Sequence, residues 1–205
     1  MPGRFFLLSR AGEIAAWAGV DEKLLPPLEA RANVSPGEDI LTITQAGPRM
    51  MRWGLIPQGR KNARGRPVME VLVNARSETV FDKSAYEGVQ RCLVPADGWY
   101  EWTGEKRKKQ PWRIRHVSGT PMAFAAIYDV WRGPGGIEVP QVATVTCPPN
   151  GDVRDIHHRM GVILFPDHFA AWLGEDQSKA AALMTPLPDG SLHVEKADDV
   201  DFARP

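Results

Sequence analysis

The sequence lacks most of the features that reveal a compartment or a partner. It has only two cysteines in 205 residues, Cys92 and Cys147, and both lie in apolar runs typical of β-strands. Two such cysteines predict buried free thiols in a reducing cytosol rather than a disulfide framework. No apolar run approaches the ~20 residues of a membrane-spanning helix, and the apolar residues 5–8 are too few for a signal peptide. We therefore expect a soluble cytoplasmic protein without a membrane partner.

A net charge is also lacking, because 25 Lys and Arg residues balance 25 Asp and Glu residues. No global field attracts nucleic acid, so such a partner would have to be met by a local patch. Two segments could supply one: residues 60–66 carry four cations and no acid, and residues 106–109 are all cationic and lead to Arg113 and Arg115. Charge runs of this kind are most often solvated loops, so they are compatible with DNA contact without requiring it.

The common catalytic motifs are missing as well. The chain has no G-x-S-x-G nucleophile motif, no phosphate-binding loop, no G-x-G-x-x-G and no C-x-x-C. His157 and His158 are neighbours whose side chains are expected on opposite faces of a strand, so we predict no metal site, and no other cofactor. Cys147 has nothing beside it that would lower the pKa of its thiol, which disfavours a catalytic pair of Cys147 and His157.

The most informative segment that is present covers residues 91–102. It predicts an apolar strand, then a Pro-Asp-Gly turn, then a second strand in which Glu101 stands among three aromatic side chains. Because successive side chains of a strand alternate, Glu101 should share a semi-enclosed face with Trp99. A carboxyl group in such a place is either paired with a cation such as Arg91, or has a raised pKa that suits it to moving protons. These residues alone leave both interpretations open.

The rest of the chain has the pattern of many short strands with few helices. Strands are expected at residues 5–8, 40–44, 112–116, 122–131 and 139–146, and helices at 12–18, 166–172 and 179–184. This pattern predicts an α+β fold: a single domain over residues 1–205 with a mainly antiparallel, curved or barrel-like sheet and a few flanking helices. A chain of this length can bury roughly 70% of its unfolded surface, so it needs no disulfide or metal to fold.

Four motifs, in this order and spacing, resemble those of the SOS response-associated peptidase family. They are Trp53-Gly54-Leu55-Ile56-Pro57, Asn74-Ala75-Arg76-Ser77-Glu78-Thr79, the segment from Cys92 to Trp102, and Ile156-His157-His158-Arg159-Met160. The resemblance covers nearly the whole chain. It implies an SRAP-like domain that recognises abasic sites in single-stranded DNA. In this family the initiator Met is removed, and residue 2, normally Cys, captures the open-chain sugar aldehyde as a thiazolidine through its amine and thiol.

The resemblance also implies roles for individual residues. Glu101 and His157 would handle protons around the aldehyde and the Schiff base, and Asn74 would orient the N-terminal amine. Arg4 and Arg76 would grip phosphates flanking the lesion. The remaining predicted DNA-binding residues are Trp53, near the displaced bases, and Arg159. This agrees with basic loops around a small acid/base cluster, since backbone contacts supply affinity while the aldehyde supplies selectivity.

The chain departs from the family at the residue that matters most. Position 2 is Pro2, so no thiol stands there and a thiazolidine cannot form. If Met1 is removed, Pro2 becomes a secondary amine that can still attack an aldehyde, and the cationic iminium formed favours β-elimination with Glu101 or His157 as base. Smaller departures are His158 and Gly161, where the family usually has Asp and Pro, and Val200-Asp201 where a Val-Asn pair is common.

The predicted function is therefore reaction of the N-terminal residue with abasic single-stranded DNA, as a crosslink or as a lyase-like intermediate. One alternative is an inactive relative that binds single-stranded DNA without chemistry. Another is a peptidase limited to self-removal of Met1. A deliberate replacement of cysteine by proline at position 2 would give the same sequence. We expect a monomer in a bacterial-type cytoplasm, associated with the nucleoid when bound to DNA.

Overall fold

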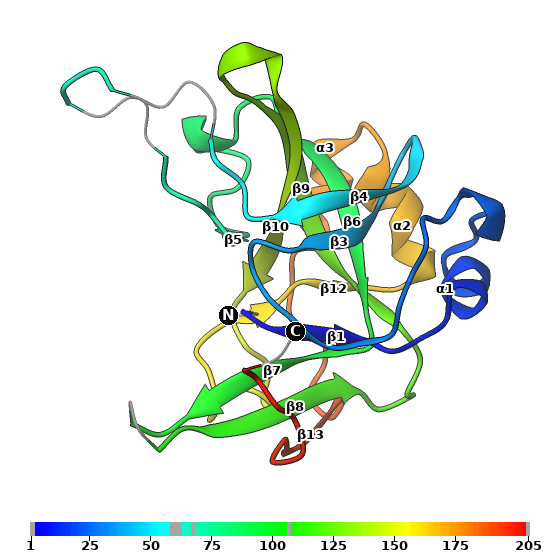
Figure 1. The fold of residues 1–205 in the computed structure, drawn as a ribbon. Helices are drawn as coiled ribbons and strands as arrows, with labels where there is room; N and C mark the ends of the chain where they lie inside the picture. Colours follow the sequence, from blue (N-terminus) through cyan, green and yellow to red (C-terminus); the bar gives the residue numbers. More distant parts are fainter. Residues whose placement is uncertain (1–2, 58–62, 67–68, 106–107, 204–205) are drawn as a thin grey trace.

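The computed structural model describes residues 3–57, 63–66, 69–105 and 108–203, and these residues form a mostly β structure with three short α-helices (Figure 1). The prediction of an α+β fold with a mainly antiparallel, barrel-like sheet is confirmed. Pro2 lies outside the described residues, as do residues 60–62 and 106–107 of the two cationic segments. In the part of the chain that is described, no helix has the length and apolarity needed to cross a membrane.

A closed ring of five strands forms the centre of the molecule. Its strands are β3 (Asp39–Thr44), β4 (Gly47–Trp53), β6 (Gln90–Ala96), β9 (Met122–Arg132) and β10 (Glu138–Cys147). Four of the five pairings are antiparallel, and the ring closes through the parallel pairing of β10 with β4. An odd number of strands cannot alternate in direction all the way around, so one parallel seam is required. The short strands β5 (Asn74–Arg76), β11 (Met160–Gly161) and β12 (Ile163–Leu164) extend the ring.

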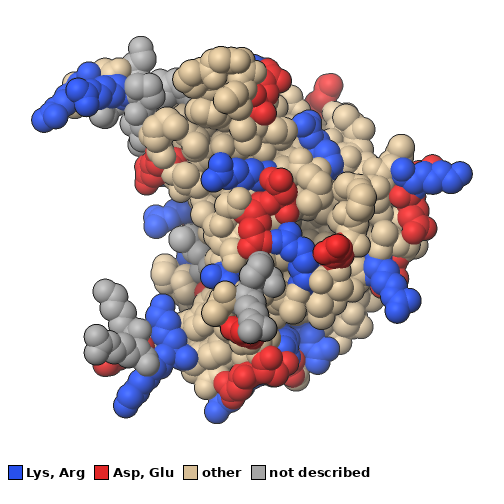
Figure 2. Space-filling model, viewed as in Figure 1, with Lys and Arg blue, Asp and Glu red and all other residues tan. Residues whose placement is uncertain are grey.

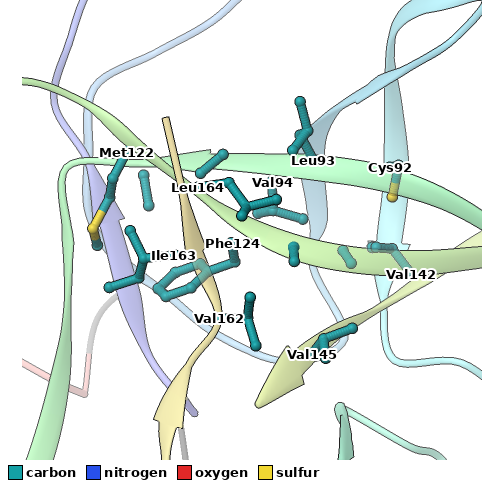
Figure 3. Close-up of a cluster of buried hydrophobic side chains, with 14 of the residues drawn as sticks. Cys92, Leu93, Val94, Met122, Phe124, Val142, Val145, Val162, Ile163 and Leu164 are labelled. Carbon is teal, nitrogen blue, oxygen red and sulfur yellow. The ribbon is translucent and has the colours of Figure 1, made fainter. Parts of the chain in front are cut away.

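Small and branched apolar side chains fill this ring. Residues 122–127 of β9, which include three alanines, are all fully buried, because β9 packs on both of its faces. Figure 3 shows the cluster that they join, with Val94 of β6, Val142 and Val145 of β10, and Ile163 and Leu164 of β12 around Phe124. Cys92 and Cys147 are buried free thiols, as predicted, and burial raises the pKa of Cys147 to about 12.

A second, antiparallel sheet lies beside the ring in the lower part of Figure 1. Its order is β13 (Leu192–Lys196), β8 (Gln110–His116), β7 (Gly98–Thr103), β1 (Phe5–Leu7) and β2 (Arg31–Val34). The N-terminal strand β1 is thus an interior strand, hydrogen-bonded to both β7 and β2. Glycine is needed at position 98, because a Cβ atom there would lie 2.3 Å from the Ile114 carbonyl and 2.4 Å from the Phe6 ring.

The helices cover the outside of these sheets. They are α1 (Ala11–Ala18), α2 (Pro166–Leu173) and α3 (Gln177–Ala182), close to the predicted ranges. Helix α1 ends at Gly19, whose φ of 67° is the left-handed conformation that glycine adopts without strain. Helix α2 packs against β6, where the Trp172 indole donates a hydrogen bond to the Cys92 carbonyl at 2.8 Å. Helix α2 is therefore fixed to β6 by a hydrogen bond as well as by packing.

One carboxylate fixes the turn between β1 and α1. Asp97, between β6 and β7, accepts hydrogen bonds from the backbone N–H groups of Leu8 and Ser9 and from the Ser9 hydroxyl. We expect Asp97→Ala to lower the free energy of unfolding by about 1–3 kcal/mol, because it leaves these donors without their acceptor. Urea unfolding measures the change, with Asp167→Ala, at an exposed position of α2, as the control. An Asp97→Ala protein as stable as the control would contradict this account.

Candidate functional site

Glu101 is a buried carboxyl group on β7. It is 4% exposed and lies on the same face of the strand as Trp99, as the alternation predicts. Burial raises the pKa of the Glu101 carboxyl, while the positive charge of the amino terminus opposes this rise. A raised pKa makes the carboxyl group better suited to accept and release a proton during a reaction.

The N-terminal strand runs directly past Glu101. Phe5 pairs with Trp99 and Phe6 with Gly98, and the Tyr100 N–H donates to the Arg4 carbonyl at 3.0 Å. The same register, continued by one residue, sets Gly3 opposite Glu101. The carboxyl group is therefore beside the first described residue of the chain.

Arg91 is not the partner of Glu101. Its Nε donates to the Trp172 carbonyl at 2.7 Å, and its Nη2 donates to the Gly174 carbonyl, both at the C-terminal end of α2. The interpretation of Glu101 as a structural acid neutralised by Arg91 is therefore wrong. A guanidinium that binds the free carbonyls of a helix C-terminus stabilises that helix instead.

Asn74 opens β5 and is held by the neighbouring strand. The backbone of Asn74 pairs in register with Thr144 of β10, and the Thr144 hydroxyl donates a hydrogen bond to Asn74 Oδ1. This bond fixes which end of the Asn74 amide is the carbonyl, so the NH2 group faces the other way. Nothing in the sequence singled out Thr144, a fully buried residue in an apolar strand.

Trp53 joins β5 to the N-terminal strand. Its ring packs edge-on against Phe5 with centroids 5.2 Å apart, and its indole N–H donates to the Val73 carbonyl at 3.2 Å. Because Val73 precedes Asn74, this contact links β5 to β1. Trp53 is 0% exposed and its ring is part of the core in this structure; its contact with displaced bases stays a prediction.

His157 lies in the loop between β10 and β11, and its ring is neutral near pH 7. Burial lowers its pKa to about 4, and the positive charge of the amino terminus acts in the same direction. The Arg159 N–H and the Arg159 carbonyl both lie 3.0 Å from Nδ1, so Nδ1 accepts from the N–H or donates to the carbonyl according to the tautomer of the ring.

The lowered pKa of His157 predicts an acid-sensitive fold. Above pH 6.5 the His157 ring is neutral in the folded and in the unfolded protein, so its titration does not change the free energy of unfolding. Between pH 6.5 and about 4 the ring takes up a proton in the unfolded chain but not yet in the folded one, so stability falls as the pH falls. We expect His157→Gln to lose less stability than the parent over this range. Urea midpoints from pH 7 to pH 4 test this, with exposed His193→Gln as the control; parallel curves for the parent and His157→Gln would contradict it.

The two neighbouring histidines are not on opposite faces of a strand. The segment that contains them is a turn, and the rings of His157 and His158 stack with centroids 4.4 Å apart and an interplanar angle of 25°. That geometric prediction is wrong because it assumed an extended backbone. Within the described ranges, no group of three or more His, Cys, Asp or Glu side chains could hold a metal ion.

Arg159 is a buried residue with several partners. It is 8% exposed, and its guanidinium forms a two-pronged ion pair with Glu78 and donates to the Thr146 carbonyl. The role of Arg159 in DNA binding stays a prediction. The ion pair ties the His157 loop to the segment after β5, which keeps the loop beside the end of β10.

The other two predicted arginines are placed differently. Arg76, at the end of β5, is exposed, and no hydrogen bond or ion pair engages its side chain among the described residues. The Arg4 Nη1 group donates to Asn33 Oδ1 at 2.8 Å and to the Phe202 carbonyl at 3.2 Å. Both arginines keep an uncompensated positive charge close to strands that carry candidate site residues.

Two cationic segments project on the same side of the molecule. They are the loop at residues 63–66, with Arg64 and Arg66, and the β7–β8 turn, with Lys108 and Lys109, and all four side chains are exposed. In Figure 2 they form two arms on the left of the view with a recess between them. Their described parts agree with the prediction of basic loops around the site.

Comparison with known proteins identifies the family. The model of the SOS response associated peptidase (SRAP) family matches residues 1–200. Abasic site processing protein YoqW of Bacillus subtilis is 36% identical over 183 residues, 84% of this chain and 80% of YoqW. Abasic site processing protein YoaM of the same bacterium is 36% identical over 183 residues, 84% of this chain and 79% of YoaM.

A solved structure of a protein from Bordetella bronchiseptica has the same fold. It superposes with a TM-score of 0.79 at 23% identity, covering 96% of this chain and 99% of that one. At 23% identity this structural similarity shows a shared fold and nothing about function. The family model covers nearly all of the chain and the two relatives exceed 30% identity, so the chain belongs to the SOS response associated peptidase family.

Proposed function

We propose that this protein processes abasic sites in single-stranded DNA, and that Pro2, once Met1 is removed, reacts with the sugar aldehyde. The relatives YoqW and YoaM are named abasic site processing proteins, which supports the lesion as the target. The observation that carries the proposal is the buried Glu101 carboxyl, with its raised pKa, beside the N-terminal strand. DNA is the only partner proposed, and the protein acts as a monomer in the bacterial cytoplasm, on the nucleoid.

The proposed reaction starts with nucleophilic addition. The Pro2 nitrogen forms a bond to C1′ of the open-chain sugar, and the oxygen of the resulting carbinolamine leaves as water after Glu101 donates a proton. The product is an iminium cation, which carries no N–H to lose. A base then takes the C2′ proton, the electron pair forms an enamine, and the C3′–O bond breaks with release of the 3′ phosphate. Hydrolysis of the iminium returns the amine.

Five predicted site residues besides Pro2 have a role in this scheme. Glu101 is the general acid for loss of water, and the neutral ring of His157 is the base for C2′ or a donor to the sugar oxygen. Asn74, whose carbonyl is held by Thr144, presents its NH2 group toward the substrate or the amine. Arg4 and Arg76 bind the phosphates on either side of the lesion.

The experiment is borohydride trapping followed by intact mass measurement. The protein is incubated with an abasic oligonucleotide and with a matched one that carries a tetrahydrofuran analogue, which has no aldehyde. We expect loss of Met1 from the protein and a reduced adduct only with the true abasic site, together with a nicked strand. A protein that lacks Met1 and gives no trapped adduct would overturn the proposed reaction.

A second candidate function is non-covalent binding of single-stranded DNA. The exposed Arg76 and the two cationic arms support it, since neither depends on the N-terminal residue. It predicts salt-sensitive binding, equal for the abasic and the tetrahydrofuran oligonucleotides, with no nick and no adduct. A peptidase limited to self-removal of Met1 would instead give Met1 loss that depends on Glu101, with no preference for DNA.

Changing Pro2 to Cys tests whether only the thiol is missing. We expect the Pro2→Cys protein to form an adduct that survives denaturation without borohydride, because the added thiol can close a thiazolidine on the captured aldehyde. Denaturing gels of labelled oligonucleotide measure the yield, with Pro2→Ser as the control for a small residue that lacks the thiol. Equal yields of stable adduct from Pro2→Cys and the parent would contradict the view that the site can still form a thiazolidine when a thiol is present at position 2.

A further inference from the structure

Arg4 is held by two neutral oxygen atoms. Its Nη1 donates to Asn33 Oδ1 at 2.8 Å and to the Phe202 carbonyl at 3.2 Å, and no acidic side chain pairs with it among the described residues. A guanidinium has five N–H donors, so Nε and Nη2 keep theirs for a further acceptor. The contacts therefore restrict the orientation of Arg4 without neutralising its charge.

Arg113 on the same sheet provides the contrast. Its Nη2 donates to both carboxylate oxygens of Asp199, at 2.9 and 2.8 Å, and its Nη1 lies 3.4 Å from Glu195. These carboxylates raise the pKa of Arg113 and compensate its charge. Both arginines thus contact the same C-terminal segment. The charge of Arg113 is compensated by carboxylates, whereas Arg4 is oriented by neutral oxygen atoms.

The ring of Phe202 anchors this segment, residues 197–203, to the sheet. It packs edge-on against Tyr100, with centroids 4.9 Å apart, and against Trp102, with centroids 5.1 Å apart. Phe6 completes the cluster, 5.2 Å from Tyr100. This small cluster lies on the face of β1 and β7 opposite to Glu101 and Trp99. It therefore fixes the Phe202 backbone relative to the N-terminal strand.

Two further contacts hold the segment in place before Phe202. Gln110 Nε2 donates to Asp198 Oδ1 at 2.8 Å, and the Ala197 N–H donates to the Pro111 carbonyl at 3.1 Å. Together with the Arg113–Asp199 pair, they attach residues 197–199 to β8. The Phe202 carbonyl is thereby held from both sides, by β8 and by the aromatic cluster.

We infer that residues 197–203 form a positioning element for the proposed site, in which Phe202 holds Arg4 in the orientation that binds a DNA phosphate. The inference rests on the proposed function, because it assigns Arg4 a phosphate. Phe202 itself touches no DNA and acts through Arg4. An arginine that is ordered before binding loses less side-chain entropy when it grips a phosphate, so removal of the Phe202 anchor weakens binding.

The test measures affinity for the tetrahydrofuran oligonucleotide as a function of salt. This probe has no aldehyde, so the covalent step does not contribute. We expect Phe202→Ala to weaken binding about 3- to 10-fold and to lower the slope of log K against log salt toward that of Arg4→Ala, about 0.7 below the parent. In the Arg4→Ala background, Phe202→Ala should have no further effect. Phe202→Leu, which keeps an apolar anchor, should retain most of the affinity.

Val200→Ala is the matched control. Val200 packs against the same cluster but makes no hydrogen bond to Arg4, so its loss should leave the salt slope unchanged. The inference is overturned if Arg4→Ala weakens binding and Phe202→Ala does not, or if Phe202→Ala weakens binding equally with and without Arg4. The proposed function would survive either result. A parent protein that shows no binding to the probe would overturn both.

Discussion

The Glu101→Gln protein is expected to form the borohydride-trapped adduct at least about 100-fold more slowly than the parent, the lower end of the range for loss of a general acid or base. The substitution keeps the size and most of the hydrogen-bonding capacity of the side chain but removes its ability to give up a proton. Glu101 is the buried acid beside the N-terminal strand, and burial already raises the pKa of its carboxyl. The rate of adduct formation under single-turnover conditions measures the effect.

Stability separates a chemical role of Glu101 from a structural one. A buried carboxyl whose folded pKa is raised costs stability as the pH rises above its unfolded value, so at neutral pH Glu101→Gln should unfold at the same or higher urea concentration than the parent. Glu105→Gln, an exposed acid near the turn that follows β7, is the control. A trapping rate that is unchanged in Glu101→Gln, or reduced equally in Glu105→Gln, would remove Glu101 from the proposed chemistry.

The Arg159→Met protein is expected to lose about 1–3 kcal/mol of stability, the cost of removing hydrogen bonds made by a charged, mostly buried group. The substitution fills a similar volume; the half-exposed Glu78 carboxylate can then be solvated by water, and the Thr146 carbonyl keeps the Ser77 N–H as a donor. The free energy of unfolding in urea measures the loss. Because the His157 loop is tied to Glu78 through Arg159, adduct formation should also slow in proportion to the folded fraction.

Glu78→Gln is the matched variant on the other side of the pair. The Glu78 side chain is 47% exposed, but its replacement leaves the buried Arg159 guanidinium without a counter-charge, so the cost should be at least as large as for Arg159→Met. The hydrogen bond from Arg159 lowers the pKa of Glu78 to about 2. The ionised Glu78 therefore stabilises the fold fully above about pH 4.5, and this stabilisation is lost as the pH falls toward 2. In Glu78→Gln the free energy of unfolding should depend less on pH over this range. A clearly smaller loss in Glu78→Gln than in Arg159→Met would contradict a buried guanidinium that depends on its acid.

The sequence predicted the local elements better than their assembly. Alternation correctly set Glu101 on the face of Trp99, because side-chain period is a local property of a strand. The closure of five strands through a parallel seam between β10 and β4 could not be predicted, since it depends on residues some ninety positions apart that meet only in the folded chain.

The resemblance names residues without giving their burial. Trp53 and Arg159 stand in motifs, and a motif does not distinguish a side chain that touches a ligand from one that supports its neighbours. Both side chains are buried in this structure, and their contact with DNA stays a prediction. The partners of Arg4 could not be predicted from the sequence, for the same reason as the parallel pairing of β10 with β4. Asn33 and Phe202 are far from Arg4 in the sequence and contact it only in the folded second sheet.

The interior position of β1 sets an order of events during synthesis. Strand β7, one of its two neighbours, begins at Gly98, so β1 cannot be enclosed until nearly half of the chain has been made. At about 5–20 residues per second, translation leaves the first residues outside the sheet for roughly 5–20 s. Any enzyme that trims Met1 has this interval in which to act on an open chain, before β1 is enclosed by its two neighbours.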